Sequence, residues 1–171
     1  LDISALKLFL MSAMDEGYNT LAISGGEPFM YRELKELLKF SKEHGYYNSV
    51  TTNGGLLGSA GNQEILQYIN LVAVSLDGKK EKHNYIRNNP AAFDQLLKAL
   101  EILKNHQGRF GFIHLLHNEP LDTLKWLCEF ALEHKARLLH LHPMESAGRG
   151  KPIFNALELT DDLRHKMFIL Y

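Results

Sequence analysis

The sequence predicts an α/β fold in which about five strand–helix units form an open, partial parallel β/α barrel. Short apolar strands alternate with helices along nearly the whole chain, and polar residues and glycines gather where the strands end. Each strand–helix–strand crossover returns the chain to the same edge, so the strands should be parallel with their carboxyl ends together. A chain of 171 residues, 45% of them hydrophobic, is most simply one domain, residues 1–171.

The first half of the chain is expected to hold three strands. Leucines on one face and lysines on the other indicate surface helices, and runs rich in β-branched or apolar residues indicate strands. The expected elements are a helix at 1–16, a strand at 21–24, a helix at 31–44, a strand at 49–52, a short helix at 63–69 and a buried strand at 71–76.

The second half repeats this alternation. The expected elements are a polar loop at 79–89, a helix from Pro90 with an apolar stripe at 93–103, a strand at 110–117, a helix opened by Pro120, a strand at 138–142 and a helix at 157–171. Cys128 lies on the apolar stripe of the helix after Pro120 and is interpreted as an inert, buried thiol.

The first strand breaks into Gly25-Gly26-Glu27-Pro28, which is the first candidate binding edge. Glycines let another molecule approach the backbone, so carbonyls at the strand end can accept hydrogen bonds from an ammonium group, and Glu27 adds negative charge. Pro28 fixes the exit and keeps Glu27 extended. For the two glycines alone, a tight turn between strand and helix is the simpler interpretation.

The composition excludes several classes of partner. A formal net charge of -1 offers no basic patch for nucleic acid, and no apolar run reaches membrane length, so we expect a cytoplasmic protein without nucleic-acid or membrane partners. Cys128 is the one cysteine in the sequence, so the chain can form neither an internal disulfide nor a thiolate metal site of its own.

Five segments, taken in order, resemble the radical S-adenosylmethionine (radical SAM) superfamily. They are Gly25-Gly26-Glu27-Pro28, Thr52-Asn53-Gly54, Ser75-Leu76-Asp77-Gly78, His83-Asn84 with Arg87, and Phe93-Asp94 before a helix. The resemblance spans nearly the whole chain and implies a TIM-like barrel with its ligand at the carboxyl ends of the strands. A dinucleotide-binding doubly wound sheet is the weaker alternative, because no G-x-G-x-x-G follows the first strand. Within the superfamily, the chain is similar to the peptide-modifying branch that includes anaerobic sulfatase maturases.

The resemblance implies a site for S-adenosylmethionine (SAM). The Gly-Gly-Glu-Pro segment matches the binder of the methionyl amino group, and Ser75 and Arg87 match positions that hold the methionyl carboxylate. Asn53 and Asp77 match the surroundings of the ribose, and residues 141–144 match the strand end that contacts adenine. The predicted cofactor-binding residues are Ser24, Gly25, Gly26, Glu27, Pro28, Asn53, Ser75, Asp77, Arg87, Leu141, His142 and Met144.

The family reaction also requires a [4Fe-4S] cluster held by three cysteines, usually spaced Cys-x-x-x-Cys-x-x-Cys, and an electron donor. Cys128 alone cannot ligate the cluster. We therefore expect a fragment, inactive alone, that lacks the first strand and the cluster loop, stops within its last helix, and self-associates through an uncovered sheet edge. The intact enzyme would cleave SAM to a 5'-deoxyadenosyl radical that removes hydrogen from a substrate, in the maturase branch a protein or peptide.

Other interpretations stay open. Asp77-Gly78 is also an ordinary turn pair, and Arg87 follows three nearby lysines, where a solvated charge is compatible with the sequence. The chain could also be a non-catalytic module that binds SAM or a nucleotide.

The histidines suggest a further alternative. His140 and His142 share one face of a strand and, with Glu145, could serve an unrelated metal-dependent barrel enzyme, although packing or substrate contact is the favoured role. His114 and His117 are expected on opposite faces of their strand.

Overall fold

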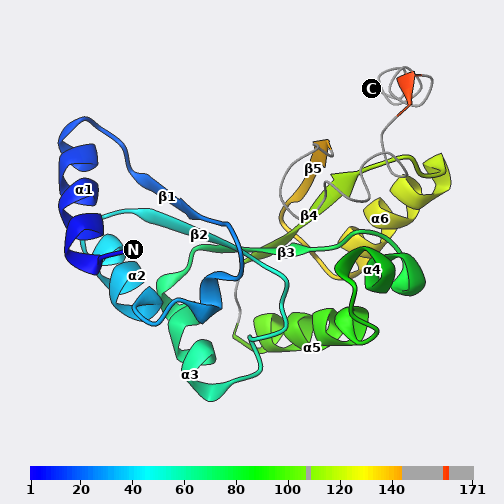
Figure 1. Cartoon of the computed structure of the whole chain (residues 1–171), viewed down its shortest axis with the longest axis horizontal. Helices are drawn as coiled ribbons and strands as arrows, with labels where there is room; N and C mark the ends of the chain where they lie inside the picture. Colours follow the sequence, from blue (N-terminus) through cyan, green and yellow to red (C-terminus); the bar gives the residue numbers. More distant parts are fainter. Residues whose placement is uncertain (107–108, 144–159, 162–171) are drawn as a thin grey trace.

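The computed structural model describes residues 1–106, 109–143 and 160–161. Their strands form one five-stranded sheet (Figure 1). The strands lie in sequence order, and each neighbouring pair is parallel. Their bounds are β1 Thr20–Ile23, β2 Tyr47–Thr52, β3 Leu71–Ser75, β4 Phe110–Leu116 and β5 Leu139–Pro143. The predicted parallel α/β sheet of about five strands is confirmed, and its strands end at one shared edge.

Helix α1 precedes β1, and the other helices make the crossovers between consecutive strands (Figure 1). Their bounds are α1 Ile3–Asp15, η1 Pro28–Met30, α2 Leu34–Glu43, α3 Ala60–Gln63, η2 Glu64–Tyr68, α4 Lys80–Arg87, α5 Ala92–Asn105 and α6 Leu121–Glu133. Among the residues that the structure describes, no helix has the length and apolar character needed to cross a membrane.

The core lies between one face of the sheet and the helices. Alternate strand residues, including Val50, Val74 and Phe112, are fully buried in a single apolar cluster with leucines of the helices. The Phe112 ring packs on Phe130 of α6 with ring centroids 5.5 Å apart. Since successive strand residues point to opposite faces, the residues between these project from the other face of the sheet.

Gly111 in β4 is required by the close approach of the chain that enters β5. A Cβ atom added at Gly111 would lie 2.5 Å from both the Cβ and the carbonyl oxygen of Leu138. Because real contacts of this kind are never so short, only glycine allows β4 and β5 to pair in this register.

The prediction of a polar loop at 79–89 is wrong, because residues Lys80–Arg87 form α4. This helix buries His83, an ionisable residue, so the sequence shows no apolar stripe of helical period. Asn88 then ends the helix in the left-handed conformation, with φ of 48°.

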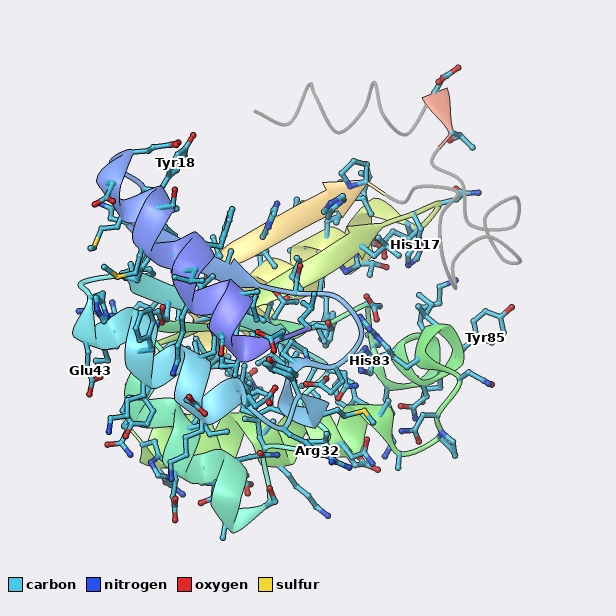
Figure 2. The ribbon with its side chains drawn as sticks, turned by 60° about the vertical axis from the view of Figure 1, so that its left-hand side comes forward. Tyr18, Arg32, Glu43, His83, Tyr85 and His117 are labelled. Atoms are coloured by element: carbon cyan, nitrogen blue, oxygen red, sulfur yellow. The ribbon has the colours of Figure 1, made fainter. Side chains whose placement is uncertain are left out.

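Two expectations about side chains are also wrong. Cys128 is exposed, because α6 turns Leu127, Phe130 and Ala131 toward the core and a neighbouring position lies about 100° around the helix. His114 and His117 are both fully buried with ring centroids 5.9 Å apart. Strand β4 ends at Leu116, so the alternation of faces no longer applies to His117, which lies at the end of that strand (Figure 2).

Three sequence expectations fall partly or wholly outside the described residues. They concern Met144, Glu145 and most of the helix expected at 157–171.

Candidate functional site

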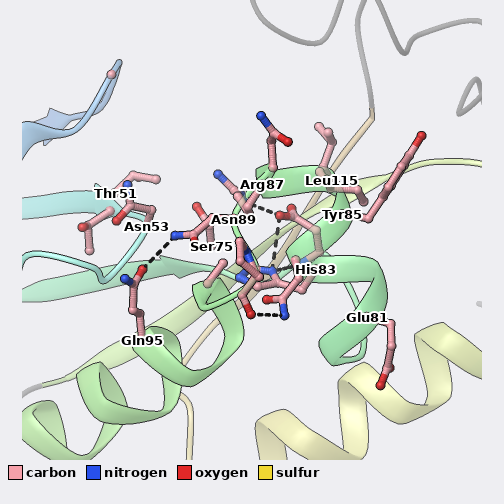
Figure 3. A pocket seen from close by; sticks show the side chains of 18 of the residues that line it. Thr51, Asn53, Ser75, Glu81, His83, Tyr85, Arg87, Asn89, Gln95 and Leu115 are labelled. Atoms are coloured by element: carbon pink, nitrogen blue, oxygen red, sulfur yellow. Dashed lines mark hydrogen bonds and ion pairs between the residues drawn. The ribbon is translucent and has the colours of Figure 1, made fainter.

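A cavity of about 1260 Å³ opens where β1, β2 and β3 end (Figure 3). Its walls come from the loops after these strands, from α4 and from the start of α5. Half of the predicted cofactor-binding residues line this one cavity, namely Gly25, Gly26, Asn53, Ser75, Asp77 and Arg87. Segments far apart in the sequence therefore meet at the carboxyl edge of the sheet, as the parallel topology requires.

The glycine pair leaves the β1 side of the cavity open. Gly25 has φ of +127°, a conformation that other residues rarely adopt. A Cβ atom added at Gly25 or Gly26 would meet nothing within 4 Å. The backbone here is free of side-chain cover, so a ligand can reach its polar groups.

Glu27 connects the glycine loop to the end of β2. Its Oε1 accepts hydrogen bonds from Thr52 Oγ1 at 2.8 Å and from the Phe29 amide at 3.3 Å, and its Oε2 accepts one from the Asn53 amide at 3.0 Å. Glu27 thus holds the two cavity loops in register and does not itself line the cavity. Its predicted contact with the cofactor amino group stays a prediction.

Asn53 is partly used in shaping the same edge. Its Oδ1 accepts a hydrogen bond from the Gly55 amide at 2.8 Å, which closes the turn after β2. Its Nδ2 group projects from a residue that lines the cavity. The side chain can therefore shape the turn and still offer a donor to a ligand hydroxyl.

Asp77 and Arg87 form an ion pair at the cavity wall (Figure 3). Arg87 Nε donates to Asp77 Oδ2 at 2.5 Å, and the Asp77 side chain is 1% exposed, whereas that of Arg87 is 33% exposed. The interpretation of Arg87 as a freely solvated charge is wrong. α4 presents Arg87 toward the end of β3, and the buried carboxylate fixes its guanidinium there.

His83 packs against the same carboxylate. Its Nδ1 lies 3.1 Å from the Asp77 amide nitrogen and 3.5 Å from Asp77 Oδ2. The amide always carries a proton, so the shorter contact makes Nδ1 an acceptor and places the ring proton on Nε2. His83 Nδ1 and Arg87 Nε thus both lie beside Asp77 Oδ2, at 3.5 and 2.5 Å.

The pKa of Asp77 reflects this competition. Burial raises the pKa of the carboxyl, but the contacts with His83 and Arg87 outweigh burial and lower the pKa from 3.8 to about 2. Asp77 is thus ionised at neutral pH. Its Oδ1 has no hydrogen-bond partner among residues 1–106, 109–143 and 160–161.

The loop after α4 is fixed by asparagine side chains. Asn84 Oδ1 accepts from the Phe93 amide at 2.9 Å, and its Nδ2 donates to the Pro90 carbonyl at 2.7 Å. Asn89 Nδ2 donates to Gln95 Oε1 at 3.2 Å (Figure 3). These bonds join α4 to α5 and so hold Arg87 in place.

Several lining residues were not predicted from the sequence, including Thr51, Tyr85, Asn88, Asn89, Gln95 and Leu115. Thr51 and Leu115 share the face of Ser75 through the register of the three strands, which the sequence alone does not give. Tyr85, Asn88 and Asn89 depend on α4, which the sequence pattern did not reveal.

The other predicted residues lie outside the cavity lining. Ser24 is exposed and Pro28 is buried at the start of η1. Leu141 and His142 belong to β5, where His142 is the register partner of Leu115 in β4. His142 therefore faces the same side of the sheet as the cavity wall, and its predicted adenine contact stays a prediction.

Comparison with known protein families identifies the family of this chain. The family described as the Radical SAM superfamily matches residues 5–131. The chain belongs to the radical SAM superfamily. The resemblance predicted from the strand-end motifs is confirmed, and the hypothesis of an unrelated barrel enzyme is wrong.

Curated relatives support this membership. The chain is 26% identical over 140 residues to the Fe-coproporphyrin III synthase of Methanosarcina barkeri, covering 81% of this chain and 35% of that protein. It is 30% identical over 108 residues to a cysteine-type anaerobic sulfatase-maturating enzyme of Clostridium perfringens, covering 57% of this chain and 29% of that enzyme. The chain thus spans about a third of the length of these radical SAM relatives.

Solved structures share the fold. Streptococcus suis SuiB bound to the precursor peptide SuiA superposes with a TM-score of 0.77 at 20% identity, covering 99% of this chain and 39% of SuiB. The enzyme anSMEcpe with bound AdoMet and Kp18Cys peptide gives a TM-score of 0.67 at 22% identity, covering 85% and 44%. The predicted partial, TIM-like radical SAM barrel is confirmed.

The thiols of this radical SAM chain do not fit an iron–sulfur cluster. The sequence contains one cysteine, Cys128, and it is exposed on α6, outside the cavity lining. A [4Fe-4S] cluster needs several thiolates at one place. The cysteine content of this chain therefore does not supply the cluster site.

Proposed function

We propose that this chain is the SAM-binding part of a radical SAM enzyme. The observation that carries the proposal is the single cavity in which Gly25, Gly26, Ser75 and Arg87 converge. SAM carries a carboxylate, an ammonium group and ribose hydroxyls, and the cavity offers a guanidinium, bare strand-end backbone and polar side chains in return.

Arg87 and Ser75 would hold the methionyl carboxylate. Arg87 uses Nε for Asp77, so the two Nη groups of its fork are not needed for that ion pair. Asp77 acts as a positioning residue, because its buried charge fixes the guanidinium at the cavity wall. Ser75 ends β3 on the same cavity and supplies a hydroxyl.

The glycine loop would bind the ammonium group. The two glycines leave the backbone uncovered, and Glu27 keeps this loop beside β2 through its bonds to Thr52 and the Asn53 amide. Residues of this chain would thus bind SAM and orient its sulfonium. In the whole enzyme, a [4Fe-4S] cluster held by cysteines other than Cys128 would supply the electron for reductive cleavage of SAM to methionine and a 5'-deoxyadenosyl radical.

We propose a protein or peptide as the substrate from which this radical removes hydrogen. Two observations support this class: SuiB and anSMEcpe, which share the fold, are described with bound peptides, and a sulfatase-maturating enzyme is among the relatives. We also propose that the enzyme takes its electron from a separate donor and is located in the cytoplasm. The chain would self-associate through the uncovered edge of its sheet. The alternative of a non-catalytic SAM-binding module shares the cavity and lacks the cleavage reaction.

Isothermal titration with SAM tests the binding proposal. Ser75→Ala should weaken binding by about 1.5–3 kcal/mol, or about 10- to 150-fold, since it removes a hydrogen bond to a charged group. Ser12→Ala on the exposed side of α1 is the matched control and should bind as the unchanged chain does. Equal affinity of the unchanged chain and Ser75→Ala, or no SAM binding by either, would remove the cavity from the proposal.

A further inference from the structure

A second cluster of polar side chains lies where β4 meets the loop before α6, on the helix-covered side of the sheet (Figure 2). It consists of His114, His117 and Glu119, which are 0%, 0% and 6% exposed. The potential ligand atoms of these three residues all lie within 4.8 Å of one another. Buried ionisable groups gather in this way when something compensates their desolvation.

The proton positions on His114 follow from its neighbours. Its Nδ1 lies 2.7 Å from the Leu76 carbonyl oxygen, and a carbonyl can only accept, so Nδ1 carries a proton. The basic nitrogen Nε2 then points at Glu119 Oε1, 2.6 Å away. A histidine whose other ring nitrogen donates to a backbone carbonyl is the usual arrangement of a metal ligand.

His117 is not explained by hydrogen bonding within the cluster. Both of its ring nitrogens and Glu119 Oε2 are buried without a hydrogen-bond partner among the residues that the structure describes. The nearest approach is 3.7 Å, between His117 Nε2 and Glu119 Oε2. A His114–Glu119 ion pair alone would leave these three buried atoms unsatisfied, and such groups are costly.

We propose that His114, His117 and Glu119 bind one divalent transition-metal ion, with Zn²⁺ as the best match. Two imidazoles and a carboxylate are a common zinc donor set, with ligand atoms about 2.0–2.2 Å from the ion. Tetrahedral geometry at that radius separates ligand atoms by about 3.4 Å. One ligand atom from each residue lies within 4.8 Å of the other two, so side-chain rotations about the ion can bring the three to this spacing.

The ion would have a structural role beside the SAM cavity. It would join the end of β4 to the start of α6 through His114 and Glu119. The bond from His114 to Leu76 extends this link to the end of β3, directly before Asp77. Zinc would therefore stabilise the end of β3, next to which Asp77 and Arg87 line the cavity.

The sequence contains a matched control in the pair His140 and His142 on β5. Both rings are exposed, with centroids 6.0 Å apart, so they could collect zinc loosely as a two-histidine pair. A double variant, His140→Gln with His142→Gln, removes this binding without touching the buried cluster. His117→Ala and Glu119→Gln remove one proposed ligand each.

Zinc retention by the tag-free chain tests the proposal. After incubation with Zn²⁺ and desalting, the zinc content is measured by elemental mass spectrometry. The unchanged chain and the β5 double variant should each retain one zinc per chain. His117→Ala and Glu119→Gln should each retain less than about a fifth of that amount. Zinc at a hundredfold excess over its Kd should raise the Tm of the unchanged chain by about 5–10 °C.

Cobalt provides a readout that does not depend on variants folding. Co²⁺ in the unchanged chain, held by the three side chains and one water molecule, should give the intense visible bands of a four-coordinate site, and added Zn²⁺ should abolish them. A pale six-coordinate cobalt spectrum, no zinc retained by the folded chain, or zinc lost only in the β5 double variant would overturn the proposal.

Discussion

Replacing Arg87 by Gln tests the ion pair that shapes the cavity wall. The substitution removes the cation from Asp77, whose side chain is 1% exposed and whose Oδ1 already has no partner among the described residues. A buried carboxylate without its cation is strongly unfavourable. We therefore expect Arg87→Gln to destabilise the fold and Asp77→Asn with Arg87→Gln to recover part of the loss.

The size of the effect follows from the pKa of Asp77. Lowering that pKa from 3.8 to about 2 corresponds, at about 1.4 kcal/mol per pKa unit, to about 2 kcal/mol of folding free energy. Because the pKa is lower in the folded than in the unfolded chain, this stabilisation is complete above pH 4. It is lost as the pH falls from about 4 to about 2 and the carboxylate is protonated.

A double-mutant cycle in urea, followed by circular dichroism, measures this contribution. The coupling free energy between Asp77→Asn and Arg87→Gln should lie between about 0.5 and 2 kcal/mol at pH 7, because His83 also contributes to the lowered pKa of Asp77. It should fall as the pH drops through about 2 and the carboxylate is protonated. Lys80→Gln is the control on the same helix. It breaks an exposed ion pair with Asp94, with a Lys80 Nζ to Oδ1 distance of 2.7 Å, and should cost less than about 1 kcal/mol. Coupling below about 0.5 kcal/mol at pH 7, or coupling unchanged by pH, would refute the reasoning.

Two further substitutions test the packing of the sheet. Gly111→Ala should lower the free energy of unfolding in urea by about 1–3 kcal/mol, since its Cβ would lie 2.5 Å from Leu138. Gly61→Ala is the control and should be near neutral, because its Cβ would meet nothing within 4 Å. Equal losses in the two variants would contradict this account. Asn48→Ala should lower the Tm by at least about 5 °C, because the fully buried Asn48 Nδ2 donates to two carbonyls and its Oδ1 accepts from Ser41; a Tm within 1 °C would show that these bonds contribute little.

Much of the fold follows from apolar pattern and glycine position. All five strands were predicted within about three residues of their bounds, because buried parallel strands are continuous apolar or β-branched runs. Helix α4 was missed because its buried residue is His83, which makes no apolar stripe. Cys128 was misplaced because the true face of α6 passes through Leu127 and Phe130, one position away.

The site was predictable where it depends on topology and not where it depends on pairing. Parallel strands bring their ends together, so Gly26, Asn53 and Ser75 could be assigned to one edge before any coordinates. The partner of Arg87 could not be predicted, because it requires the helical geometry of α4. The role of Glu119 was likewise not predicted. Its carboxylate lies close to the rings of both His114 and His117, just before Pro120.

The central claim is that the cavity binds SAM by its methionyl carboxylate, and a ligand lacking that group tests it most directly. Isothermal titration of the unchanged chain with SAM and with decarboxylated SAM compares two ligands that differ at this one group. We expect the decarboxylated ligand to bind about 10- to 150-fold more weakly, the equivalent of about 1.5–3 kcal/mol for a hydrogen-bonded charge. Equal affinities for the two ligands would contradict the claim.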